Sequence, residues 1–124
     1  MSNIRHVVVV RKDLQLVPGL LAAQVAHIND KFMREGIRNK RLFSENQLEW
    51  MKTPYLSILA VNCLEDLSEI IDHAHRQELT VNIWEDLIPS PTFPDRSIKA
   101  KVAISIGPDD FDAIKIVTGA LEPY

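Results

Sequence analysis

Four consecutive valines at residues 7–10 form the centre of the first apolar segment of the chain, residues 4–11. Valine favours extended backbone because its branched side chain restricts rotation about the bond to the β-carbon. A strand that is apolar without alternation is typical of a sheet with both faces covered. Residues 4–11 therefore predict a central strand that has packing layers on both sides.

Helical spacing of apolar residues follows this strand. Pro18 and Gly19 interrupt the chain, and residues 20 to about 34 then carry a core stripe made of Leu21, Val25, Ile28 and Phe32. Three further helices are predicted from start signals and apolar spacing, at residues 44–50, 62 to about 77 and 111–117. The first of these begins with the spacing of a capping box, Ser44 and Gln47.

Three further strands are predicted at residues 55–61, 80–84 and 101–106. Residues 85–96 hold three of the seven prolines, which cannot donate to a β-ladder, so a long ordered loop is expected there. Gly107 and Pro108 are expected to end the fourth strand. The order β-α-α-β-α-β-β-α predicts a three-layer α/β/α sandwich with a mixed four-stranded sheet, built by one domain over residues 1–124.

Composition excludes several classes of protein. The chain has 124 residues and no apolar run of the roughly 18 residues that a membrane span needs, so a soluble, cytoplasmic protein is expected. Cys63 is the only cysteine, which excludes an intrachain disulfide and a cysteine metal framework. The sequence also lacks a P-loop, a G-x-G-x-x-G motif and a G-x-S-x-G motif.

Charge is distributed unevenly along the chain, whose net charge is −3. Residues 1–43 carry eight lysines and arginines against three acidic residues, whereas the remainder carries six against fourteen. The basic part includes Lys31, Arg34, Arg38, Lys40 and Arg41. This run is consistent with a surface that faces phosphate groups, and equally with an ordinary solvated helix face.

One side of the first predicted helix carries polar groups. This side consists of positions i, i+4, i+7 and i+11, away from the core stripe. They hold Leu20 and the polar residues Gln24, His27 and Lys31. Because a histidine ring can exchange a proton near neutral pH, His27 at the mouth of a cleft can orient water, relay a proton or bind phosphate. The alternative is a surface histidine bound to the backbone.

Asp86 and Asp13 each follow a predicted strand. From such a position a carboxylate can reach a site at the sheet edge, although capping or turn formation is the alternative role for both. His73 and His75 are two residues apart on a helix and do not share a face, which argues against a metal pair. Cys63 is expected to be a small buried residue.

Four motifs, at residues 7–14, 19–27, 106–108 and 117–124, resemble those of the type II peptidyl-tRNA hydrolase family. Residues 7–14 and 19–27 resemble the family's strand, R-x-D-L turn and G-K-x-A-A-Q-x-x-H helix. Residues 106–108 and 117–124 are similar to its I-G-P and V-T-G-x-L-x-x-Y ending. The resemblance covers nearly the whole chain and implies the family's α/β fold.

The resemblance also implies a function. Members of the family hydrolyse the ester that joins a peptide to tRNA, and they need no metal or other cofactor. It assigns catalytic roles to Gln24, His27 and Asp86, and it assigns substrate binding to Arg11, Asp13, Lys31 and Thr92. It further implies tRNA binding through the basic N-terminal helices and a homodimer.

Two positions depart from the family pattern. Leu20 stands where the family has lysine, and residues 87–92 replace its D-x-G-R-T loop with a longer segment without glycine or arginine. Three hypotheses follow: a peptidyl-tRNA or related acyl-ester hydrolase, a non-catalytic ligand- or protein-binding module on the same fold, and an enzyme with a small-molecule substrate. A basic groove leading to His27 favours the first; an apolar pocket of Leu20, Leu87 and Phe93 favours the second.

Overall fold

The computed structural model describes residues 3–38 and 43–124. Its elements are β1 (Ile4–Arg11), the short 3-10 helix η1 (Lys12–Leu14), α1 (Pro18–Arg38), α2 (Glu45–Lys52), β2 (Leu56–Val61), α3 (Leu64–Arg76), β3 (Val81–Pro89), β4 (Ser97–Asp110), α4 (Phe111–Thr118) and β5 (Glu122–Pro123).

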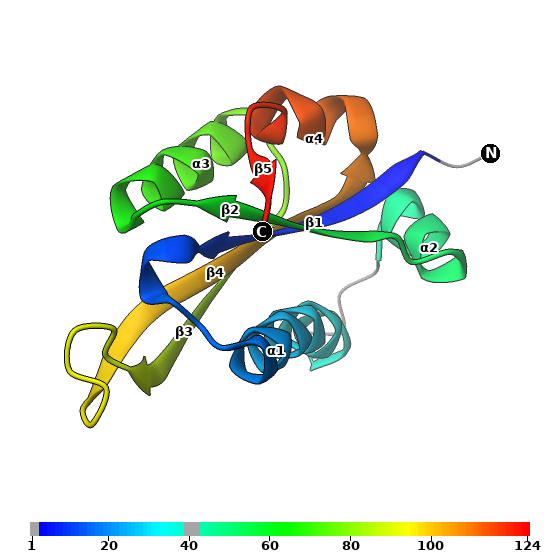
Figure 1. Ribbon diagram of the computed structural model, residues 1–124. Helices are drawn as coiled ribbons and strands as arrows, with labels where there is room; N and C mark the ends of the chain where they lie inside the picture. Colours follow the sequence, from blue (N-terminus) through cyan, green and yellow to red (C-terminus); the bar gives the residue numbers. More distant parts are fainter. Residues whose placement is uncertain (1–2, 39–42) are drawn as a thin grey trace.

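A mixed sheet in the order β3-β4-β1-β2-β5 forms the middle layer, with α3 and α4 on one face and α1 and α2 on the other (Figure 1). β1 and β2 are parallel, while β4 is antiparallel to both β1 and β3. The predicted three-layer α/β architecture is confirmed. The predicted number of strands is wrong, because the sheet has five: Glu122 and Pro123 pair with the edge of β2.

β1 occupies the position that its valines predict. Val7 and Val9 belong to the apolar cluster under α3 and α4, and Val8 and Val10 belong to the cluster under α1. Successive residues of a strand point to opposite faces, and helices cover both faces of this sheet. All four side chains are therefore buried. A continuous run of valine therefore supplies both cores of the sandwich.

α1 is longer at both ends than residues 20–34. It begins at Pro18, which suits a first helical turn because the backbone N–H groups there have no partner inside the helix. Val25, Ile28 and Phe32 are buried as predicted. In α2, the predicted capping box is present: Ser44 Oγ accepts from the Gln47 N–H, and Gln47 Oε1 accepts from the Ser44 N–H.

The prediction of a long loop at residues 85–96 is wrong. β3 continues to Pro89 and pairs with β4, which begins at Ser97, so only residues 90–96 connect the two strands. β3 tolerates its terminal proline because it lies at the edge of the sheet. Gly107 and Pro108 do not end β4 either, since Asp109 and Asp110 still pair with β1 after a register shift.

Candidate active site

α1 and β3 run past each other in opposite directions, so that residue numbers rise along the helix as they fall along the strand. Lys31 contacts Ile83, His27 contacts Trp84, and Gln24 contacts both Trp84 and Asp86. The polar side of α1 predicted from helical spacing therefore faces one strand. The contacts bring Gln24, His27 and Lys31 alongside Asp86.

Gln24 is the buried centre of this group, with a side chain that is 1% exposed. Its Oε1 accepts a hydrogen bond of 2.7 Å from Trp84 Nε1, and its Nε2 donates one of 3.2 Å to Asp86 Oδ2. An indole can only donate and a carboxylate can only accept, so a single orientation of the amide satisfies both partners. Trp84 thereby orients Gln24, and Gln24 orients Asp86.

Asp86 lies on β3 and does not open a loop, which corrects its predicted setting. It points to the same face as Trp84, two residues earlier, because side chains alternate along a strand. Its Oδ1 accepts a hydrogen bond of 2.8 Å from the Leu87 N–H. Each carboxylate oxygen thus has one neutral donor and further acceptor capacity, and the half-buried group can still receive a hydrogen bond from a ligand.

His27 is exposed and stacks on Trp84, with ring centroids 5.1 Å apart and planes inclined by 27°. The indole therefore performs two tasks, because it fixes the histidine ring through its face and the glutamine through its edge. Trp84 was not predicted as a site residue. Because the predicted strand ends at Trp84, the sequence pattern does not indicate that Trp84 and Asp86 share a face, as they do on β3.

We name the seam between α1 and β3, which carries Gln24, His27, Trp84 and Asp86, the α1–β3 cleft. It is basic beyond Trp84. A hollow of about 270 Å³ is lined by Trp84 and four residues of α1, namely Lys31, Arg34, Glu35 and Arg38. Lys31 Nζ donates a hydrogen bond of 2.7 Å to the Ile83 carbonyl, and Arg34 pairs with Asp30. Lys40 and Arg41 of the predicted basic run lie outside the described residues. Three of the five predicted cations therefore lie on the helix that carries His27.

Three predicted substrate-binding residues lie apart from this cluster of contacts. Arg11 and Asp13 bind each other through two hydrogen bonds of 3.1 and 2.8 Å at the end of β1, and Arg11 also donates to the Lys101 carbonyl. Thr92 is exposed in the β3–β4 connection. Among the described residues, no side-chain hydrogen bond or ion pair joins any of the three to Gln24, His27 or Asp86.

Leu20 lies one helical turn before Gln24 and packs with the apolar cluster under α1. It lines a cavity of about 190 Å³ whose opposite wall is formed by Pro89, Ser90, Pro91 and Pro94. Neither Leu87 nor Phe93 lines this cavity, contrary to the expected composition of an apolar pocket. Leu87 points to the other face of β3, and Phe93 packs against the Arg96 guanidinium at 5.1 Å.

Comparison of the chain with known proteins identifies its family. The model of the family described as "Peptidyl-tRNA hydrolase PTH2" matches residues 4–124. The chain belongs to the PTH2 family. A peptidyl-tRNA hydrolase of Nanoarchaeum equitans is 34% identical over 122 residues, which are 98% of this chain and 99% of the relative. The resemblance noted from the motifs is confirmed.

Two further relatives extend the comparison within PTH2. A peptidyl-tRNA hydrolase of Staphylothermus marinus is 31% identical over 122 residues, covering 98% of this chain and 95% of the relative. The mitochondrial peptidyl-tRNA hydrolase 2 of Bos taurus is 31% identical over 121 residues, covering 97% of this chain and 64% of the relative.

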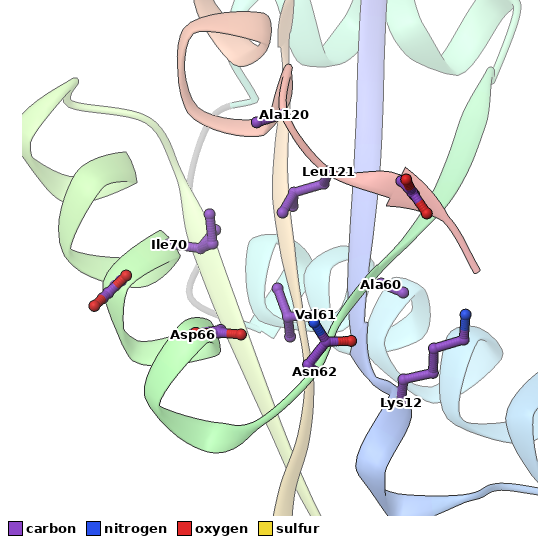
Figure 2. Close-up of a pocket in the computed structure, with 10 residues that line it drawn as sticks. Lys12, Ala60, Val61, Asn62, Asp66, Ile70, Ala120 and Leu121 are labelled. Carbon is purple, nitrogen blue, oxygen red and sulfur yellow. The ribbon is translucent and has the colours of Figure 1, made fainter.

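A separate cavity of about 410 Å³ lies at the carboxyl ends of β1 and β2 in this PTH2 member (Figure 2). Lys12 and Asn62 follow the two strands, Asp66 and Ile70 come from α3, and Leu121 closes it from the C-terminal segment. None of the predicted site residues lines this cavity. This cavity is therefore distinct from the α1–β3 cleft.

Within residues 3–38 and 43–124, no three histidine, cysteine, aspartate or glutamate side chains gather in a way that could hold a metal ion. Every helix in the described ranges is too short or too polar to cross a bilayer.

Proposed function

We propose that this protein hydrolyses the ester bond of peptidyl-tRNA at the α1–β3 cleft. The observation that carries the proposal is the chain of hydrogen bonds from Trp84 through Gln24 to Asp86, with His27 stacked on the same indole. Membership of the PTH2 family, whose relatives are named peptidyl-tRNA hydrolases, supports the same reaction.

Asp86 and His27 supply the chemistry in this proposal. The Gln24 amide positions the carboxylate through a hydrogen bond, and Asp86 accepts a hydrogen bond from the attacking water. Water adds to the ester carbonyl carbon, and the bond from that carbon to the ribose oxygen breaks. His27 transfers the proton that water loses to the ribose oxygen. The products are free tRNA and a peptide with a free carboxyl group.

Substrate binding is assigned to the basic part of the cleft. Lys31, Arg34 and Arg38 lie beside Trp84, where they attract the phosphates of tRNA without reading its sequence. Because this attraction releases counterions, binding should weaken as the salt concentration rises. Arg11, Asp13 and Thr92 are assigned to substrate binding through the family resemblance alone.

Single-turnover hydrolysis of peptidyl-tRNA by the purified protein tests the proposal. We expect His27→Ala and Asp86→Asn each to lower the rate about a hundredfold or more, in line with losing a group that acts in the transition state. His75→Ala and Asp72→Asn are matched controls, since both residues are exposed on α3. An inert wild-type protein, or full activity in both cleft variants, contradicts the proposal.

A non-catalytic binding module on the same fold is the second candidate, and Leu20 is the observation that favours it. An apolar side chain occupies the position of the family's lysine, so a cation that can stabilise developing negative charge is missing there. If the wild-type protein binds peptidyl-tRNA without hydrolysing it and Leu20→Lys restores hydrolysis, this second candidate is correct.

The homodimer and the cytoplasmic location stay predictions of this proposal. Sedimentation of the purified chain over a range of concentrations tests the first, and fractionation of cells that express it tests the second.

A further inference from the structure

An apolar cavity lies beside Leu20, toward the start of α1 from Gln24. Leu20 precedes Gln24 by one helical turn, about 5 Å along the axis. Pro89 follows Asp86 by three strand residues, about 10 Å of extended chain. The cavity of about 190 Å³ between them therefore lies about one helical turn from Gln24 and about 10 Å of strand from Asp86, on the side away from Lys31 and Arg34.

The walls of this cavity are mostly apolar. Its lining combines residues before and at the start of α1 with the β3–β4 connection, and within the described part of the chain none of these residues is charged. They are Leu14, Gln15, Leu16, Val17, Leu20, Pro89, Ser90, Pro91 and Pro94. A charged group that entered would lose its hydration without gaining an ionic partner, so the cavity discriminates against such groups.

Local hydrogen bonds hold the proline-rich wall in place. Ser90 Oγ accepts from the N–H groups of Thr92 and Phe93, and the Ser90 N–H donates to the Arg96 carbonyl. The Arg96 N–H in turn donates to the Phe93 carbonyl. Prolines further restrict the backbone of this segment. The wall is therefore formed before a ligand arrives, and little ordering is needed when one binds.

We propose that this cavity receives the side chain of the amino acid esterified to tRNA and selects substrates in which that side chain is apolar. The inference rests on the proposed function. With the polyanion at the Lys31 end and the ester at Asp86, the acyl group points toward Leu20. A cavity of about 150 Å³ lined by apolar groups can hold benzene, so 190 Å³ accommodates a phenyl or isobutyl group.

Three substrates that share one tRNA test the inference: its N-acetyl-phenylalanyl, N-acetyl-glycyl and N-acetyl-aspartyl esters. We expect wild-type kcat/KM for the phenylalanyl ester to exceed that for the glycyl ester about tenfold or more, the range that apolar pockets give. The aspartyl ester is expected to be the poorest substrate.

Variants locate the source of this preference. Leu20→Ala and Val17→Asp are expected to reduce the phenylalanyl-to-glycyl ratio to less than about threefold, and Leu20→Met is expected to keep it. Val17 is 65% exposed, so its substitution leaves folding intact even if the Leu20→Ala variant fails to fold. Leu48→Ala is the matched control, because Leu48 is an exposed leucine of α2 that does not line the cavity.

The outcomes separate the two proposals. If no ester is hydrolysed, the proposed function fails and the pocket assignment fails with it. If all three esters react at the same rate in the wild-type protein, hydrolysis stands and the pocket assignment is overturned. If Val17→Asp slows all three esters equally, the cavity holds a part common to every substrate, such as the terminal base, and the assignment is again overturned.

Discussion

The two faces of the sheet bury different kinds of side chain. The cluster beneath α3 and α4 is built from apolar residues such as Val9, Leu67 and Ile104. The face covered by α1 and α2 buries Gln24 and His6 among its apolar groups. The first face therefore depends chiefly on shape and volume, with Thr118 hydrogen-bonded inside α4, whereas the second must satisfy more polar atoms.

Buried polar groups on the second face differ in their hydrogen bonding. Gln24 is bonded at both ends of its amide and leads to the half-buried carboxylate of Asp86. His6 lies edge-on between Phe32 and Trp50, and neither of its ring nitrogens has a partner within the described residues. Burial of a polar side chain alone therefore does not indicate a functional site. A series of hydrogen-bonded side chains that ends at an accessible carboxylate does.

Leu67→Ala should give the largest effect on stability. Leu67 is fully buried in the cluster under α3, so truncation leaves a cavity and should lower the free energy of unfolding by about 2–5 kcal/mol. Hydrolysis per folded molecule should stay at the wild-type value, because the residue lies on the face opposite α1. Urea unfolding and single-turnover rates measure the two quantities. A lower hydrolysis rate in fully folded Leu67→Ala protein would show that the two faces do not act independently.

His6 should make stability depend on pH. Burial lowers its pKa from 6.5 to about 4, so between these values the unfolded chain binds a proton that the folded protein rejects. The free energy of unfolding should therefore fall as the pH decreases from 6.5 to 4, by about 3 kcal/mol from this group. Above pH 6.5 the contribution is constant, because the ring is neutral in both states.

His6→Leu isolates that contribution, since leucine has a similar volume and does not titrate. Urea unfolding at pH 7 and pH 4.5 should show a smaller loss of stability in this variant than in the wild type. His75→Leu, on an exposed position of α3, should keep the wild-type pH dependence. An unchanged pH dependence in His6→Leu would mean that the buried ring is not the source.

Trp84→Phe and Trp50→Phe compare two indole hydrogen bonds of equal length on the same face. Trp84 Nε1 donates to Gln24 and Trp50 Nε1 donates to the Tyr55 carbonyl, each at 2.7 Å. Both substitutions should lower the free energy of unfolding by about 1–3 kcal/mol, because each leaves an acceptor without its donor. Only Trp84→Phe should also slow hydrolysis, since it frees the Gln24 amide to turn away from Asp86. If Trp84→Phe and Trp50→Phe hydrolyse peptidyl-tRNA at equal rates, Trp84 has no role in the site.

Local spacing predicted the parts of the fold whose patterns are long. Four valines predicted the central strand, and the stripe through Val25 and Ile28 predicted the buried side of α1. The predicted loop at residues 85–96 is wrong because prolines exclude a central strand but not an edge strand such as β3, where a missing N–H is tolerated. β5 has two residues, too few to show any periodicity.

The candidate site was predicted only in part, for a physical reason. Helical spacing placed Gln24, His27 and Lys31 on one side of α1, but it gives no information about which strand that side meets. Asp86 was assigned through the family resemblance, and Trp84 was missed, because their hydrogen bonds to Gln24 span about sixty residues of sequence. Likewise, nothing in the local pattern predicts that Ser105 is fully buried.

Ser105→Ala should have the smallest effect, and it tests whether an unbonded hydroxyl contributes anything to the α1 face. Ser105 lies on β4 opposite Val8, and its Oγ has no hydrogen-bond partner in the described part of the chain. Removing the hydroxyl should change the free energy of unfolding by less than about 0.5 kcal/mol, because no bond is lost. Thr118→Val on α4 is the bonded counterpart, since Thr118 Oγ1 donates to the Ile114 carbonyl at 3.1 Å, and should cost about 1 kcal/mol. A larger loss in Ser105→Ala than in Thr118→Val would show that the hydroxyl of Ser105 is bonded in solution, and that the α1 face contains a second polar network beside the one centred on Gln24.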